Sequence, residues 1–183
     1  MPRRSSLPTL RSSLAALTLA ALTLPVQAEE KCSARDSHGV SVCEAGLPAA
    51  AVRQLAVVQE QSQWCWAASI QMIFAHHGFK VPQQEIVKDG YGLVTNKPAP
   101  SGEAMTRALS RPWIDQDDKP FLGRALASDA LASRFQVSNQ KVIAELVAGR
   151  PLLMGAIGHA VVLVNLRYER TERGSMRILG GTV

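Results

Sequence analysis

Residues 59–69 read QEQSQWCWAAS, and Cys65 stands where this polar segment gives way to an apolar one. From Trp64 onward the apolar residues recur with the period of a helix, and Gly78 is placed to end that helix. Ser62 is a suitable N-cap for it. The pattern therefore predicts that Cys65 lies in the first turn of a helix.

A thiol in such a position has chemistry that an ordinary cysteine lacks. A free thiol has a pKa of about 8.5 and is a poor nucleophile at neutral pH. The positive end of a helix favours the thiolate, and a nearby imidazole favours it more strongly by forming a thiolate–imidazolium pair. A polar amide before the cysteine can receive a developing oxyanion together with the backbone N–H of the cysteine. The segment thus carries the groups that acyl transfer requires.

Three of the four histidines are poorly placed to act as the base. His38 lies in a polar stretch between two other cysteines. His76 and His77 sit at the far end of the helix that Cys65 begins. At about 1.5 Å per residue they are more than about 15 Å from the thiol, so we expect surface or capping roles.

His159 is the better candidate because Gly158 precedes it and an apolar run, Ala160 to Leu166, follows it. Such a run is typical of a buried strand. A histidine at the head of a core strand can face a helix terminus across a cleft. The alternative is a hydrogen-bonded core histidine without catalytic duty.

The other patterns divide the chain into a helical first half and a strand-rich second half. We expect a short strand at Leu55–Val58, helices at Pro82–Lys88, Glu103–Leu109 and Ser138–Val147, a polar connector at Arg111–Asp118, strands at Leu152–Ile157, Ala160–Leu166 and Met176–Leu179, and a charged turn at Glu169–Gly174. This order predicts an α+β fold. One domain is expected at 51–183, after an N-terminal extension at 29–50.

Residues 1–28 resemble a secretory signal. Arg3, Arg4 and Arg11 give a positive start, Leu14 to Leu24 is apolar, and residues 26–28 (VQA) fit a cleavage site. The apolar run is about half of the roughly 20 residues that a spanning helix needs. We therefore predict a secreted or periplasmic protein with no stable membrane insertion after cleavage. A short uncleaved anchor is the alternative.

Most of the positive charge belongs to this segment. The formal net charge is +5, and the first 28 residues hold three arginines and no acid, which leaves 17 basic against 15 acidic residues. No basic block or basic helix remains. Nucleic acid is therefore not expected as a partner.

Export changes how the three cysteines are interpreted. Cys32 and Cys43 flank a short polar stretch that favours a turn, and in an oxidising compartment they can form a disulfide. Closing that loop is worth roughly 3 kcal/mol. Two unpaired thiols are the alternative, and four ligands for a metal site are not found nearby. Cys65 is then the odd thiol, and we expect neither a metal nor another cofactor.

These motifs resemble those of a known family. Gln59 followed by Cys65-Trp66-Ala67 is similar to the signature of papain-like cysteine peptidases, and the longer WCWAAS with Met72 resembles the bacterial branch related to avirulence-type and bacteriocin-processing papain-like proteases. Residues 148–153 (AGRPLL) and 158–163 (GHAVVL) resemble the segment that carries the histidine of that branch. The resemblance covers roughly residues 50–180.

The resemblance implies a papain-like fold, in which an N-terminal helical half, with the nucleophile at a helix N-terminus, packs on a C-terminal antiparallel sheet. It implies that Cys65 is the nucleophile, His159 the general base and acid, and Gln59 the oxyanion-hole glutamine. Gln61 and Gln63 are alternatives for the last role, because the loop lacks the glycines that fix the usual geometry. The implied function is an exported thiol peptidase that acts through an acyl-enzyme on a peptide or protein substrate.

One departure from the family concerns the residue that orients the histidine. The family uses a later Asn or Asp, whereas Asn165 is the one such residue after His159, about 20 Å away along a straight strand. We expect an incomplete C-terminus, a dyad, or an impaired domain that binds peptide or protein. A cell-wall amidase is disfavoured because its usual Asp-Cys-Ser-Gly is here Trp-Cys-Trp-Ala.

Overall fold

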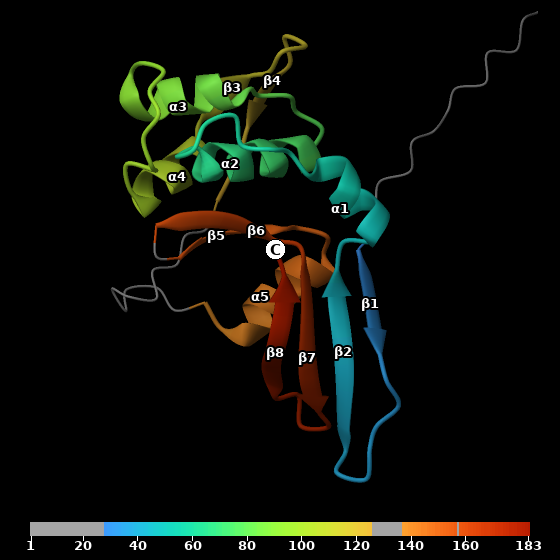
Figure 1. Ribbon diagram of the computed structural model, residues 1–183. Coiled ribbons are helices and arrows are strands. Elements are labelled where there is room, and N and C mark those ends of the chain that lie inside the picture. Colours follow the sequence, from blue (N-terminus) through green and yellow to red (C-terminus); the bar gives the residue numbers. More distant parts are fainter. Residues whose placement is uncertain (1–27, 126–136, 157) are drawn as a thin grey trace, which may run out of the picture.

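Most of the helices cluster at one end of the molecule, and a four-stranded sheet with one helix packed on it forms the other (Figure 1). The computed structural model describes residues 28–125, 137–156 and 158–183, so the predicted signal lies outside it except for Ala28. In chain order the elements are β1 (Glu29–Cys32), β2 (Val40–Gly46), α1 (Ala49–Leu55), α2 (Cys65–His76), α3 (Gln83–Tyr91), α4 (Gly102–Ala108), β3 (Pro112–Ile114), β4 (Pro120–Leu122), α5 (Asn139–Val147), β5 (Leu152–Ala156), β6 (His159–Leu163), β7 (Asn165–Thr171) and β8 (Met176–Thr182). The expected α+β class is confirmed.

Helix α2 is the central element of the helical end. It begins at Cys65, which therefore lies in the first turn as predicted, and the Trp66 and Ile70 side chains are fully buried. Gly78 follows the C-cap with a φ of 85°, a left-handed conformation that glycine adopts without strain. The predicted cap is wrong, because the N-cap residue is Trp64 and the Ser62 hydroxyl instead accepts a hydrogen bond from Asn96. The predicted Ser138 cap of α5 is confirmed by its bond from the Lys141 N–H.

Strands β5 and β6 form an antiparallel hairpin that lies beneath α2 (Figure 1). The predicted strand Ala160–Leu166 is wrong as a single unit, because it breaks at Val164. Residues before the break pair with β5, and residues after it pair with β2 and β8. The run is apolar on both sides of the break because the chain stays buried as it passes from one sheet to the other.

The four-stranded sheet has the order β1-β2-β7-β8, with every pair antiparallel. Helix α5 packs on it through Ile143 and Leu146, which are buried with Cys43 and Tyr168. Residues 29–46, expected to be an extension, thus supply two strands to the sheet. The expected turn at Glu169–Gly174 starts too early, because β7 continues through Thr171.

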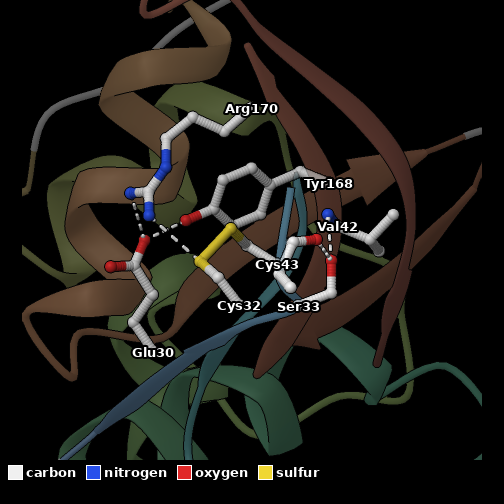
Figure 2. Close-up of a disulfide and its surroundings, with 8 residues drawn as sticks. Glu30, Cys32, Ser33, Val42, Cys43, Tyr168 and Arg170 are labelled. Atoms are coloured by element: carbon white, nitrogen blue, oxygen red, sulfur yellow. Dashed lines mark hydrogen bonds and ion pairs between the residues drawn. A yellow bond between two sulfur atoms is a disulfide. The ribbon is translucent and has the colours of Figure 1, made fainter. Parts of the chain in front are cut away.

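The predicted disulfide between Cys32 and Cys43 is present and joins residues that face each other in the β1–β2 ladder (Figure 2). Figure 2 shows Tyr168 and Arg170, both from β7, reaching Glu30 on β1. Burial, followed by the hydrogen bond to Glu30, raises the pKa of Tyr168 to about 12. Beyond its pairing with β2, therefore, β1 is held by one covalent link and by polar contacts to β7.

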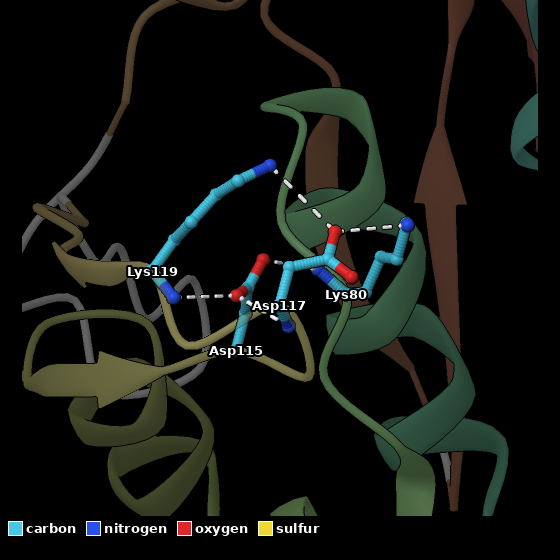
Figure 3. Close-up of polar contacts among 4 residues, drawn as sticks. All are labelled: Lys80, Asp115, Asp117 and Lys119. Carbon is cyan, nitrogen blue, oxygen red and sulfur yellow. Dashed lines mark hydrogen bonds and ion pairs between the residues drawn. The ribbon is translucent and has the colours of Figure 1, made fainter.

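Two predictions for the helical end of the molecule are wrong. Leu55–Val58 does not form a strand, because α1 includes Leu55 and residues 56–58 have no regular secondary structure. The polar connector 111–118 contains β3, which pairs with β4. Asp115 organises their turn by accepting backbone hydrogen bonds from Lys80, Asp117 and Lys119 (Figure 3). Burial alone would raise the pKa of Asp115, but these bonds outweigh it and hold the pKa below its usual value.

Among the residues that the structure describes, no helix has the length and apolar character needed to cross a membrane.

Removing the disulfide should lower stability without changing the fold. Cys32→Ala combined with Cys43→Ala is expected to lower the free energy of unfolding by about 3 kcal/mol, because the unfolded chain regains the entropy of the open loop. Denaturant unfolding of the double variant and of the oxidised wild type measures the difference. Equal midpoints and equal slopes would contradict the expectation.

The ion pair at the end of α5 should make stability depend on acid pH. Hydrogen bonds from Arg150 and then Lys141 lower the pKa of Glu145 from 4.5 to about 2. A carboxyl group whose pKa is lower in the folded state stabilises the fold at pH values above its unfolded-state pKa. This stabilisation is lost as the pH falls through the folded-state pKa. Glu145→Gln should therefore lower the free energy of unfolding by about 1 kcal/mol at neutral pH, after allowance for solvent screening. The difference should vanish near pH 2, and a difference independent of pH would contradict this.

Candidate active site

Cys65 is the first residue of α2 and the one cysteine that the disulfide leaves free. Its side chain is half-buried and packs against the core of the helical end. The first N–H groups of a helix have no acceptor within the helix, so the thiol lies where backbone donors and the helix dipole favour negative charge.

The two tryptophans beside Cys65 bind one loop. Trp64 and Trp66 are buried, with exposures of 3% and 1%, and their indole N–H groups donate to the carbonyls of Thr95 and Lys97 at 2.8 and 3.2 Å. Both tryptophan side chains therefore pack in the core.

Asn96 completes this attachment between the other two loop residues. Its side-chain oxygen accepts from the Gln63 N–H at 3.0 Å, and its amide donates to the Ser62 hydroxyl at 3.0 Å. The loop at 95–97 is thus joined by four hydrogen bonds to the first turn of α2 and to the segment that leads into it. The sequence pattern did not indicate this attachment, because single polar side chains carry no periodic signal.

Of the three glutamines before Cys65, Gln59 has the most restricted side chain. It is half-buried and its amide donates to the Ser62 carbonyl at 3.1 Å, so it folds back along the segment that leads to the thiol. Gln61 and Gln63 are exposed. They contribute backbone groups, since the Gln61 carbonyl accepts from the Trp64 N–H and the Gln63 N–H donates to Asn96.

His159 is the first residue of β6 and is exposed. Its position relative to Cys65 follows from how α2 and the hairpin are aligned. His76 and His77, at the end of α2, line one pocket with residues 147–150, which lead into β5. Strand β5 therefore begins near the C-terminal end of α2 and the chain returns as β6.

The lengths of the two elements agree with this alignment. Helix α2 is about 18 Å long and β5 about 17 Å, so the β5–β6 turn reaches the N-terminal end of the helix. Ala160, directly after His159, is buried in the same cluster as Trp64 and Trp66. The structure thus places His159 and Cys65 at the same end of α2.

The remaining histidines lie elsewhere. His76 and His77 are at the opposite end of α2, as expected from their spacing. Burial, and then the charges of His76 and Arg150, lower the pKa of His77. His38 is in the exposed turn between β1 and β2.

Asn165 does not accompany His159. It begins β7, where its Cα partners are Gly46 and Thr182, and the whole of β6 separates it from His159. That strand is about 17 Å long. The expectation that Asn165 is too distant to orient the histidine agrees with this placement.

One polar residue that the sequence pattern did not single out lies behind the glutamine segment. Gln83, in the first turn of α3, is 1% exposed and accepts a hydrogen bond from the Glu60 N–H at 2.9 Å. Only its position after a proline at a helix start was visible in the sequence. A buried glutamine there cannot be distinguished from an exposed one without the fold.

Comparison with known proteins gives one result for this chain. A family model described as papain-like cysteine protease AvrRpt2 matches residues 48–178, a range that includes Gln59, Cys65 and His159. Neither the curated proteins nor the solved structures include a match. The expected resemblance to avirulence-type papain-like peptidases is confirmed.

Thiol labelling tests the state of the cysteines. We expect iodoacetamide to modify one cysteine per chain, Cys65, in unreduced protein, because the other two are joined and Cys65 is half-buried. Peptide mapping of the labelled protein identifies the site, and reduced and unfolded protein should take up three labels. A label on Cys32 or Cys43 without reduction would contradict the arrangement.

Proposed function

Because the chain belongs to the papain-like cysteine protease AvrRpt2 family, we propose that it is an exported thiol peptidase with Cys65 as nucleophile and His159 as general base and acid. One observation carries the assignment of residues. The free thiol begins α2 at the end of the helix to which the β5–β6 turn brings His159. Its substrate is a peptide or protein, as the family description implies.

The reaction follows from these groups. The Cys65 thiolate attacks the carbonyl carbon of a peptide bond, forming a C–S bond and moving the π electrons of the carbonyl to its oxygen. When this oxyanion collapses, the C–N bond breaks and the His159 imidazolium gives its proton to the departing amine. Neutral His159 then takes a proton from water, whose oxygen displaces the sulfur. The products are a carboxylate-bearing peptide, an amine-bearing peptide and the original ion pair.

The oxyanion needs donors that are already in place. The Cys65 N–H has no acceptor within its helix because it belongs to the first turn. The Gln59 amide donates one hydrogen to Ser62 and has a second available for substrate. These two groups supply the electrostatic stabilisation that acyl transfer requires. Gln59 is preferred to Gln61 and Gln63 because its side chain is the half-buried one.

Asn165 begins β7, beyond the far end of β6, and is too distant to orient the His159 ring. We propose that the attraction between the Cys65 thiolate and the His159 imidazolium holds the ring in place. Gly158, with a φ of 77°, forms the turn that brings the ring to the start of β6.

Export is the part of the proposal that the cysteines support. Disulfides persist in oxidising compartments and are rare in the cytosol. The Cys32–Cys43 bridge favours a secreted or periplasmic location, in agreement with the signal expected at 1–28. β1 begins at Glu29, where the mature chain is predicted to start.

Single substitutions test the assignments. Cys65→Ala should abolish peptide hydrolysis with little change in folding, and His159→Ala should do the same because the ion pair is lost. Gln59→Ala should lower turnover by on the order of 10²–10³. Turnover is measured on casein-derived peptides, with circular dichroism as the test of folding.

Matched variants serve as controls. His76→Ala removes a histidine at the other end of α2, and Gln61→Ala removes an exposed glutamine of the same segment, so both should keep wild-type turnover. Full activity in Cys65→Ala would end the peptidase proposal. A folded wild type that binds peptides and cleaves none would indicate a binding domain instead.

A further inference from the structure

Gln83 is a polar side chain whose amide makes three hydrogen bonds in the interior. It is 1% exposed. Its amide oxygen accepts from the Glu60 N–H at 2.9 Å, and its amide nitrogen donates to the Val58 carbonyl at 2.9 Å and to the Gln71 side-chain oxygen at 3.0 Å. A buried amide that satisfies both of its donors and its acceptor has a fixed orientation.

The three partners of Gln83 belong to two parts of the proposed site. Val58 and Glu60 are the residues on either side of Gln59, so Gln83 holds the backbone before and after it. Gln71 lies on α2, the helix that Cys65 begins. One side chain on α3 therefore connects the segment of the proposed oxyanion donor to the helix of the proposed nucleophile.

Near Gln59 the segment depends on hydrogen bonds rather than on regular structure or apolar packing. It lies between α1 and α2 without regular secondary structure, and Val58 is 86% exposed. Apolar packing at Val58 therefore cannot fix the position of Gln59. The buried hydrogen bonds from Gln83 are a fixed attachment to the rest of the fold.

We propose that Gln83 is a positioning residue, which sets the distance between the Gln59 amide and Cys65. This inference rests on the proposed peptidase function. Oxyanion donors act only when they are held close to where the charge develops, and a displacement of about 1 Å can cost on the order of 10² in rate. Gln83 itself does not contact substrate.

Gln83→Met tests the inference because methionine has a similar volume and makes none of the three hydrogen bonds. We expect kcat on a peptide substrate to fall by on the order of 10²-fold, with KM within about twofold of wild type. The rate at which iodoacetamide alkylates Cys65 should not change, because displacement at a saturated carbon develops no oxyanion. A variant that was merely misfolded would change all three quantities.

The neighbouring residue provides the matched control. Gln84 is exposed, and its side chain contacts the Glu60 carboxylate rather than the backbone of the segment. Gln84→Met should therefore keep the kcat of the wild type.

A double-mutant cycle with Gln59→Ala decides whether Gln83 acts through Gln59. If it does, Gln83→Met should lower kcat by less than about twofold in the Gln59→Ala background. An equal loss in both backgrounds would overturn the inference, as would wild-type kcat in Gln83→Met alone. If Gln83→Met does not fold, Gln71→Met is used in its place, because it removes only the link from Gln83 to α2. Gln71→Met should lower kcat about tenfold, and the same cycle with Gln59→Ala then tests the inference.

The outcomes separate this inference from the function on which it rests. A wild-type chain that cleaves no peptide removes both. An active wild type whose kcat falls in Cys65→Ala and Gln59→Ala, but not in Gln83→Met, keeps the function and removes the role of Gln83.

Discussion

Helix α2 lies against the β5–β6 hairpin through a buried apolar surface, and this contact determines which distant parts of the chain meet. The helix carries the thiol at its first residue, and the hairpin carries His159 at its turn. Neither side chain needs a direct bond to the other to be brought to the same end. Because protein interiors are densely packed, a shift of the hairpin along the helix would have to repack the core between them.

Around this contact the polar groups serve mainly to fix loops. The indole N–H groups of Trp64 and Trp66 bind the 95–97 loop on one side of the thiol. Gln83 binds the segment that contains Gln59. In each case a residue from the core uses its polar atoms to hold irregular backbone. The segments next to Cys65 are therefore defined by hydrogen bonds, and the thiol itself by the helix.

The sequence predicted those features that depend on local pattern. The start of α2, the strand after His159 and the Cys32–Cys43 bridge follow from periodicity and short loops. The break at Val164 does not, because the apolar run continues through it. At the break the chain passes Gly46 so closely that a Cβ atom there would lie 2.2 Å from the Val164 carbonyl oxygen, and that closeness exists only once β2 has paired with β7. Gln83 escaped notice for the same reason, since its partners are set by tertiary structure.

The bridge between β1 and β2 also protects an edge of the sheet. Strand β1 has four residues, all of them exposed. Strand β2 has seven residues and pairs along its length with β7. If β1 were to detach, the backbone N–H and C=O groups of β2 that face β1 would lose their partners and offer a template to another chain. The disulfide therefore keeps the longer strand β2 covered by the short edge strand β1. A chain made in a reducing compartment would be the one prone to self-association.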